Sequence, residues 1–168
     1  MPSIAVIMPV RNCEQYVRQA IESIFNQSKK DFVFYILDDY STDSTWDIVK
    51  EYKDKENRIY CSRNSNQLGL TKSLNASIGY CNYLWSGIKY FARQDGDDYS
   101  MPNRFERQFD FMEKNKDIGL VGSDIFIKND VKNYTNESKR LNGDYNIRRG
   151  FFWSQELPHG TYFFRKEV

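Results

Sequence analysis

Short apolar runs alternate along this chain with longer stretches of helical period. This alternation is typical of βα units, which build a mostly parallel sheet with helices packed on its faces. The pattern predicts strands at residues 4–8, 32–37, 58–62, 90–93, 118–121 and 161–164. It predicts helices around residues 16–25, 46–52, 70–85 and 102–112, with Asn12 available as the N-cap of the first. We therefore expect an α/β fold.

The length of 168 residues fits one domain, which would bury about 70% of the surface of its unfolded chain. Residues from about 128 to 143 are polar and rich in Asn, Lys and Asp, and we interpret them as a mobile excursion within that domain. Residues 165–168 look like the beginning of a helix that does not continue. We therefore expect a chain that is truncated at its C-terminus.

The charge balance excludes some partners. With 24 Lys plus Arg against 23 Asp plus Glu, the net charge of +1 creates no global field that would attract nucleic acid or an anionic membrane.

Cys13, Cys61 and Cys81 form no Cys-x-x-Cys pair, which indicates free thiols and a reducing compartment. No segment approaches the ~20 apolar residues that cross a bilayer. The expected location is the cytoplasm, with peripheral attachment to the inner face of the membrane left open.

Polar residues follow three of the predicted strands. They are residues 9–12 after the first strand, Asp38 and Asp39 after the second, and residues 95–98 after the fourth. In an open α/β sheet, ligands bind at the carboxyl ends of the strands, where helix N-termini direct backbone N–H groups at anions. We expect these three segments to form one binding site.

The densest acidic segment contains Asp95, Asp97 and Asp98 around Gly96. Three aspartates within four residues repel one another unless a cation or hydrogen-bond donors neutralise them. Mg²⁺ and Mn²⁺ take one or two carboxylates and complete their shells with water and phosphate oxygens. The segment thus favours a metal that arrives with a diphosphate, and the small Gly96 lets the backbone pass close to such a ligand. A simple turn or helix cap is the alternative that the motif alone leaves open.

Four segments in order resemble the sequence blocks of family 2 glycosyltransferases, which have the GT-A fold. They are residues 6–12, 36–43, 66–75 and 92–104. The second block departs from the family pattern only at Tyr40, where glycine is usual. The resemblance implies a Rossmann-like, mostly parallel sheet flanked by helices in a single domain over residues 1–168. The donor-binding part would span about 1–127, and the start of the acceptor-side region about 128–168.

The resemblance also implies an activity. The chain would transfer a hexosyl or N-acetylhexosaminyl group, with inversion, from a UDP-sugar to a hydroxyl of a glycan, lipid-linked or other acceptor. The cofactor would be Mn²⁺ or Mg²⁺, held by Asp97, with Asp95 near the ribose and as a second candidate ligand. Asp39 would accept the N3–H of uracil, a donor that cytosine lacks. Alternatively, Asp39 caps the following helix, which Asp38 or Ser41 could do instead.

The other candidate donor-binding residues come from the same blocks. They are Pro9, Val10, Arg11, Asn12, Ser41, Asn66, Gly69, Lys72 and Gly96. Pro9, Val10 and Arg11 would border the base and ribose. Lys72 would reach the base or the diphosphate, or else be a solvated helix lysine.

In this family a carboxylate farther along the chain acts as general base, after a strand that resembles residues 159–165. Because the sequence ends at Val168, we expect the donor site without the base, and a fragment with little or no activity. His159, the only histidine, faces the acceptor or is an ordinary hydrogen-bonded side chain. Trp153 lies in the variable acceptor-side region and is the best aromatic candidate for a sugar contact.

Three other functions are alternatives to sugar transfer. A receiver-like, magnesium-binding signalling domain would need a phosphoacceptor aspartate on the third strand, which ends here without one. A nucleotidyltransferase would show a Gly-rich loop after the first strand, and residues 9–12 contain no glycine. A non-catalytic sugar-nucleotide-binding module remains compatible with the sequence.

Overall fold

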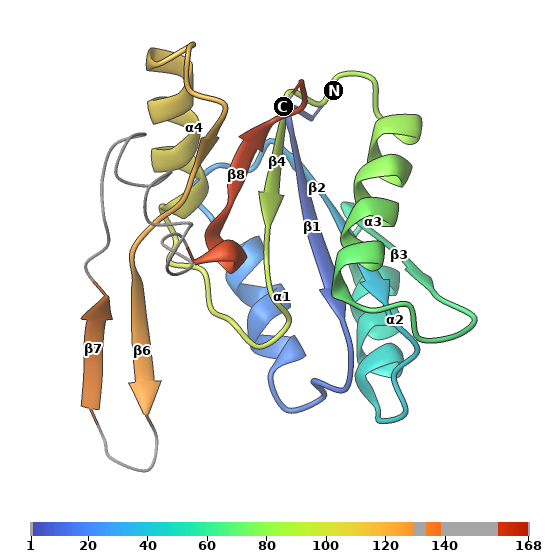
Figure 1. Cartoon of the computed structure of the whole chain (residues 1–168). Coiled ribbons are helices and arrows are strands. Elements are labelled where there is room, and N and C mark those ends of the chain that lie inside the picture. The colour runs from blue at the N-terminus through green and yellow to red at the C-terminus, as the bar shows by residue number, and fades with distance from the viewer. Residues whose placement is uncertain (1, 130–133, 139–157, 168) are drawn as a thin grey trace.

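The computed structural model describes residues 2–129, 134–138 and 158–167, and it confirms the α/β prediction (Figure 1). The strands of the main sheet are β1 (Ile4–Val10), β2 (Phe32–Asp38), β3 (Ile59–Arg63), β4 (Tyr90–Arg93), β5 (Leu120–Val121) and β8 (Phe163–Arg165). The helices are α1 (Val17–Phe25), α2 (Thr45–Lys55), α3 (Leu70–Leu84) and α4 (Arg104–Lys114). A single 3₁₀ turn, η1 (His159–Thr161), precedes β8.

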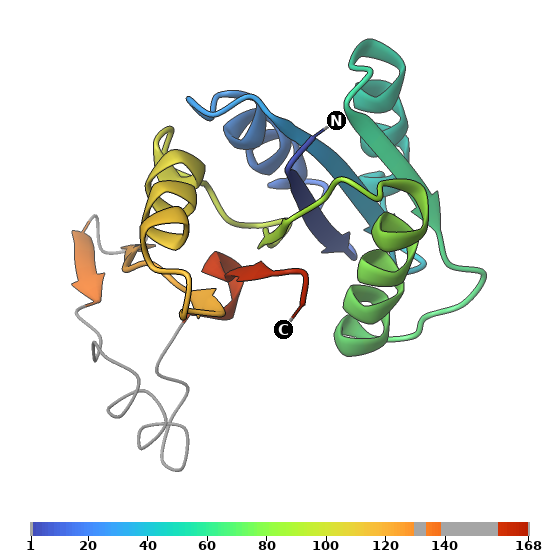
Figure 2. The same cartoon turned by 90° about the horizontal axis from the view of Figure 1, so that it is seen from above.

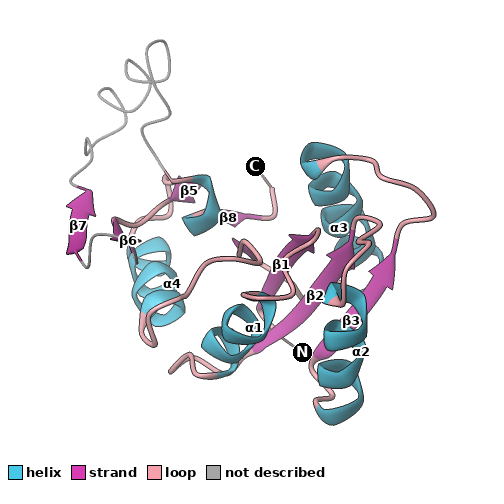
Figure 3. Ribbon diagram, turned by 90° about the horizontal axis from the view of Figure 1, so that it is seen from below, coloured by secondary structure: helices cyan, strands magenta, loops and turns pink. Residues whose placement is uncertain are grey.

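The main sheet has the strand order β3-β2-β1-β4-β8-β5. The first four strands are parallel, whereas β8 runs antiparallel to both β4 and β5. The register pairs Val10 with Asp38, so β1 and β2 end side by side and their following loops are neighbours. Figure 3 looks onto this edge, where the carboxyl ends of the parallel strands lie.

Both faces of the sheet are covered by helices. Alternate β1 residues Ile4, Val6 and Met8 pack into a core with residues of α1, α2 and α4. Ala5 and Ile7 point to the opposite face, where α3 packs (Figures 1 and 2). Burial on both faces explains why β1 is an uninterrupted apolar run rather than an alternating one.

The first strand continues past Met8, where the sequence predicted its end, to Val10. Proline normally interrupts a central strand because it cannot donate a hydrogen bond. The last pair between β1 and β4 is Ile7 with Arg93, and Ile7 O accepts from Gln94 N. Pro9, two residues later, faces that same side beyond the last pair, so its missing N–H costs no ladder bond.

Two local expectations were wrong. Helix α1 begins at Val17 after Tyr16, so Asn12 is not its N-cap. Arg165 lies in β8 and is followed by a turn at residues 166–167, not by a helix. In the region of the expected excursion, β6 (Ile125–Asn129) pairs with β7 (Tyr134–Ser138) in a separate antiparallel sheet of two strands. Trp153 and the remainder of the expected excursion lie outside the described residues.

The helices of this fold are short. The longest among the described residues, α3, has 15 residues. A membrane-spanning helix needs about 20 predominantly apolar residues. Within the described part of the chain, none of the helices has the length and apolarity to cross a bilayer.

Candidate active site

The loops that follow β1 and β2 are tied together at the carboxyl edge of the sheet. Ser41 Oγ accepts from Asn12 N at 3.1 Å, and Asn12 Oδ1 accepts from Thr42 N at 2.8 Å. Thr45 Oγ1 accepts from Cys13 N at 2.8 Å. Asn12 has φ of +48°, a left-handed conformation that asparagine tolerates better than most residues. Two predicted site residues, Asn12 and Ser41, thus lie in contact and fix the shape of this edge.

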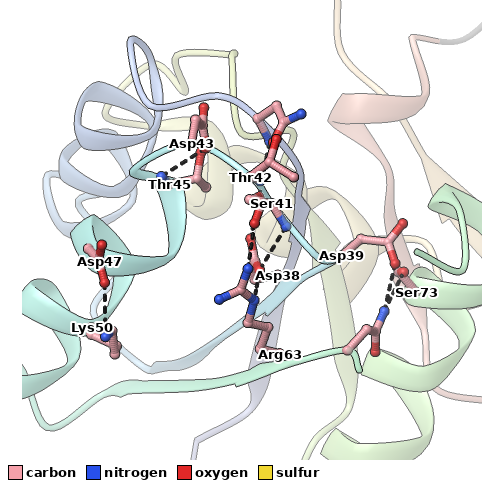
Figure 4. Close-up of polar contacts among 12 residues, drawn as sticks. Asp38, Asp39, Ser41, Thr42, Asp43, Thr45, Asp47, Lys50, Arg63 and Ser73 are labelled. Atoms are coloured by element: carbon pink, nitrogen blue, oxygen red, sulfur yellow. Dashed lines mark hydrogen bonds and ion pairs between the residues drawn. The ribbon is translucent and has the colours of Figure 1, made fainter. Parts of the chain in front are cut away.

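Asp38 organises the turn that leaves β2. Its carboxylate is fully buried and accepts from Ser41 N at 3.1 Å, from Ser41 Oγ, and from Arg63 Nε at 3.0 Å (Figure 4). The next but one residue, Tyr40, has φ of +61°. An L side chain is strained in that conformation, which glycine adopts freely. The guanidinium of Arg63 lies 5.6 Å from the centre of the Tyr40 ring.

Asp39 is buried and holds the segment that leads into α3. Its Oδ1 accepts from Asn64 Nδ2 at 2.7 Å and from Leu68 N at 2.8 Å, and its Oδ2 accepts from Gly69 N at 2.8 Å. Gly69 is the residue before α3 and has φ of +88°, which only glycine adopts without strain.

The alternative prediction, that Asp38, Asp39 or Ser41 caps α2, is wrong. At the start of that helix, Thr45 N donates to Asp43 Oδ1 at 3.0 Å.

The hydrogen bonds to Asp39 set its ionisation. Burial alone would raise the pKa of its carboxyl, but the bonds from Leu68, Asn64 and Gly69 outweigh burial and hold the pKa below its usual value. Asp39 is therefore an anion at neutral pH. Its Oδ2 accepts one of these bonds, and a carboxylate oxygen can accept two.

Residues 95–98, called here the acidic loop, form a tight turn after β4. Asp98 N donates to Asp95 O at 3.2 Å. The buried Gln94 side chain stabilises the turn, because its Nε2 donates to Asp95 O at 3.0 Å and to Asp98 O at 2.9 Å. Sequence reasoning missed Gln94, although a glutamine at the end of a buried strand is a signal that it satisfies backbone groups nearby.

The three aspartates of the acidic loop have different surroundings. Asp95 is paired with the buried side chain of Arg93, at 3.0 Å from Nε to Oδ1 and 3.3 Å from Nη2 to Oδ2. Burial, followed by the charges of Asp95 and Asp97, raises the pKa of Asp98. Asp97 is exposed and has no hydrogen-bond or ion-pair partner among the described residues. The carboxylate of Asp98 likewise has no hydrogen-bond or ion-pair partner among the described residues, so Asp97 is the more exposed of two carboxylates that are open to a cation.

The donor set fits a metal that shares its ligands with a diphosphate. Within the described residues, no three His, Cys, Asp or Glu side chains form a complete ligand set. Mg²⁺ and Mn²⁺ need only one or two carboxylates when phosphate and water supply the other oxygens. Burial is the largest cause of the raised pKa of Asp98, and the charges of Asp95 and Asp97, which follow it, are what a bound cation would offset.

Gly96 supports the acidic loop by packing, which differs from the role expected from the sequence. A Cβ at this position would lie 2.8 Å from Val10 Cγ1 and 2.9 Å from Cys13 Sγ. The loop after β4 thus rests directly on the loop after β1. The absence of a side chain at residue 96 allows this contact between the two loops.

Replacing Gly96 with alanine should therefore destabilise the protein. Gly96→Ala is expected to lower the free energy of unfolding by about 1–3 kcal/mol, the cost of overpacking. The control is Gly79→Ala in α3, where an added Cβ would meet nothing within 4 Å. That change should raise stability by about 0.5–1 kcal/mol, because alanine is the better helix former. Urea denaturation of both variants measures the difference, and equal effects would contradict the packing argument.

The turn η1 brings the predicted acceptor-side segment against the acidic loop. A Cβ at Gly160 would lie 2.8 Å from Asp98 Oδ2 and 2.9 Å from Asp95 Oδ2. His159 Nδ1 lies 3.5 Å from Asp95 Oδ2 and is buried without a hydrogen-bond partner among the described residues. His159 is thus not an ordinary histidine satisfied at Nδ1, and it borders the carboxylates of the site.

The remaining predicted residues lie around this centre. Val10 is buried beneath Gly96, and Arg11 is exposed where the chain leaves β1. Lys72 is exposed in the first turn of α3, and Asn66 is exposed in the segment before that helix. An open pocket lies next to Asp39 in the chain. Its lining residues are Tyr40, Ser41, Thr42, Asp43, Arg63 and Asn64. None of these lining residues belongs to the acidic loop, so the pocket is not the metal site.

Comparison with known proteins identifies relatives of this chain by sequence. The chain is 34% identical over 158 residues to an uncharacterized glycosyltransferase of Methanocaldococcus jannaschii, covering 93% of this chain and 53% of that protein. It is 31% identical over 130 residues to WfaP of Escherichia coli, a UDP-Glc:α-D-GlcNAc-diphosphoundecaprenol β-1,3-glucosyltransferase, covering 77% of this chain and 49% of WfaP. The chain thus spans about half the length of these curated relatives.

A solved structure shows the same fold. TarS 1–349 from S. aureus, in complex with UDP-GlcNAc, superposes with a TM-score of 0.59 at 25% identity, over 69% of this chain and 32% of that one. The likeness confirms the predicted GT-A fold, with its mostly parallel sheet and flanking helices. A sequence model of the family described as glycosyl transferase family 2 matches residues 5–167. This protein therefore belongs to glycosyl transferase family 2.

Proposed function

We propose that this chain binds a UDP-sugar through the carboxyl edge of its sheet, with Mn²⁺ or Mg²⁺ at Asp97, and serves a sugar transfer that inverts the anomeric centre. The observation that carries the proposal is the arrangement of the acidic loop. Asp95 is neutralised by Arg93, Gln94 holds the backbone, and Asp97 is left exposed as a free carboxylate. This arrangement suits a cation that brings its own phosphate ligands.

Asp39 supports the choice of uracil. It is a buried anion on the edge that carries the acidic loop. The N3–H of uracil is a donor that a carboxylate accepts, whereas N3 of cytosine is an acceptor and would face the carboxylate unpaired. The complex of TarS with UDP-GlcNAc supports the same donor class.

The transfer step divides among these groups as follows. The acceptor oxygen attacks the anomeric carbon as the bond from that carbon to the phosphate oxygen of UDP breaks, on the opposite side. A bound metal supplies a Lewis acid that stabilises the negative charge that develops on UDP. Gln94 holds the backbone on either side of Asp97, which would bind the metal, and Asp39 would orient the base. The hydroxyl proton passes to a general base, a role that we assign to none of the described residues.

A lipid-linked or other glycan hydroxyl is the proposed acceptor class, supported by the acceptor in the name of WfaP. The proposed location is the cytoplasm, with reaction at the inner face of the membrane, because Cys13, Cys61 and Cys81 are free thiols. No role for nucleic acid is proposed.

Calorimetric titration with UDP, CDP and GDP, each with and without Mn²⁺, tests the proposal. UDP should bind only with the metal, and CDP should bind about 10- to 100-fold more weakly because Asp39 would lose its donor. Equal binding of the three nucleotides, or binding that ignores Mn²⁺, would refute it. Donor hydrolysis and transfer, measured alongside, separate an enzyme from a non-catalytic sugar-nucleotide-binding module.

A further inference from the structure

A buried polar network connects the acidic loop to the turn η1. It begins at Gln94, whose amide donates to the backbone of Asp95 and Asp98. Gln94 Oε1 accepts from Arg104 Nη1 at 3.0 Å and from Ser100 Oγ at 2.6 Å. The acidic loop is thus bound to the first turn of α4 by side chains that are buried in the protein.

Arg104 lies in the middle of this network as a buried cation. Its Nη2 donates to Arg93 O at 2.5 Å, its Nη1 donates to Ser100 Oγ at 2.7 Å, and its Nε donates to Gln108 Oε1 at 3.2 Å. Each of these acceptors is neutral, and among the described residues the guanidinium has no ion pair with a carboxylate. Burial lowers the pKa of Arg104 to about 10, opposed by the charges of Asp98 and Asp95. Arg104 therefore remains a cation at neutral pH, close enough to Asp95 and Asp98 for their charges to act on it.

Gln108 makes the connection from Arg104 to the turn. It is buried and uses both ends of its amide: Oε1 accepts from Arg104, and Nε2 donates to Thr161 O at 2.8 Å. Thr161 is the last residue of η1, and its Oγ1 accepts from Ser123 N at 3.0 Å. The turn so held is the one that places Gly160 against the carboxylates of Asp95 and Asp98.

We propose that Gln108 is a positioning residue that fixes the His159–Thr161 turn over the acidic loop. Its effect on transfer rests on the proposed function, but the coupling itself belongs to the folded chain and can be measured without metal or donor. In the working enzyme, this coupling would set the distance from His159 to the metal and diphosphate. A side chain with no contact to either ligand would thus control the geometry of the site.

Gln108→Glu separates the two halves of the connection. The glutamate keeps an oxygen for Arg104 Nε but replaces the donor that faces Thr161 O with an acceptor, so the turn is repelled while the acidic loop keeps its support. Gln108→Met removes both bonds and is the second variant if the glutamate prevents folding. The matched control is Gln27→Glu, another buried glutamine, which accepts from Phe105 N and donates to Ser23 O and Met101 O. Gln27 has no hydrogen bond to residues 158–161 among the described contacts.

Amide hydrogen exchange of the metal-free protein is the first measurement. Thr161 N donates to Pro158 O at 2.9 Å, and Tyr162 N donates to His159 O at 3.2 Å. Both amides should exchange about tenfold faster in the Gln108 variants, the change expected from one lost hydrogen bond, and at the wild-type rate in Gln27→Glu. Wild-type exchange of these amides in both folded Gln108 variants would overturn the proposal.

The second measurement uses the single histidine of the chain as a spectroscopic reporter. In the wild type, Mn²⁺ bound with UDP should broaden the NMR signals of the His159 imidazole, because paramagnetic broadening falls steeply with distance. Gln108→Glu should lose most of this broadening while its affinity for UDP with Mn²⁺ stays within about twofold of wild type. Retained broadening would overturn the proposal. Failure of UDP to bind the wild type would contradict the proposed function instead, and amide exchange would still decide the role of Gln108.

Discussion

Asp97→Asn is expected to abolish the metal-dependent binding of UDP, with a loss of affinity of at least about 100-fold in calorimetric titration with Mn²⁺. The physical reason is the division of labour within the acidic loop. Arg93 already neutralises Asp95, whereas Asp97 is exposed and has no other partner among the described residues. Asparagine keeps the shape of the side chain but removes the charge that attracts a divalent ion.

The same substitution should leave the fold intact. Asp97 is exposed, so Asp97→Asn should change the free energy of unfolding by no more than about 0.5 kcal/mol. Removing its charge should lower the pKa of Asp98, which Asp97 helps to raise. The matched control is Asp110→Asn, an exposed aspartate of α4, which should bind UDP as the wild type does. Unchanged UDP affinity in Asp97→Asn would show that the metal is held elsewhere or is not needed.

Asp39→Asn should have the largest effect on stability, lowering the free energy of unfolding by about 2–3 kcal/mol in urea denaturation. The buried carboxylate accepts from Asn64, Leu68 and Gly69, and all three partners are donors. An asparagine amide would place its own N–H against one of them and remove the negative charge that the others stabilise. UDP binding should weaken in the same variant, because the segment before α3 loses its anchor.

The effect of pH follows from the lowered pKa of Asp39. A carboxyl whose pKa is lower in the folded state contributes stability that is fully present above its unfolded pKa of about 3.9. That contribution is lost as the pH falls through the folded value. The stability difference between wild type and Asp39→Asn should thus be constant near neutral pH and shrink below about pH 4. Asp47→Asn, an exposed aspartate paired with Lys50, should show little difference at any pH, and a similar loss there would contradict the assignment.

Much of the edge that carries the site could be predicted from local sequence. Parallel strands place their carboxyl ends together, so the strand pattern alone puts Asp38, Asp39 and the acidic loop on one edge of the sheet. Asp39 and Gly69 are in contact, because the segment before α3 returns to the end of β2. The resemblance carried by four spaced blocks gave the fold class correctly.

The buried polar network could not be read in this way. Gln108 looks like a solvated helix residue in sequence, and its partner Thr161 lies 53 residues later. Its position four residues after Arg104, on the side of α4 that also carries Phe105 and Met112, was the available signal that both polar side chains are buried. Contacts between distant segments depend on packing, which local periodicity does not encode.

Two glycine positions show the same limit. Gly96 was expected to admit a ligand, which stays a prediction, and in the structure it also lets the loops after β1 and β4 approach at Val10 and Cys13. The sequence assigned no role to Gly160, although a Cβ there would meet the carboxylates of Asp95 and Asp98. Only the fold identifies which groups approach each of these glycines.

A crystal structure of this chain with UDP and Mn²⁺ tests the central claim most directly. The account predicts anomalous scattering from one manganese ion beside Asp97, bridging to both phosphates, with Asp95 still paired to Arg93. The contradicting result would be a bound nucleotide with no ion near Asp97, and with that carboxylate turned towards a lysine or a helix end.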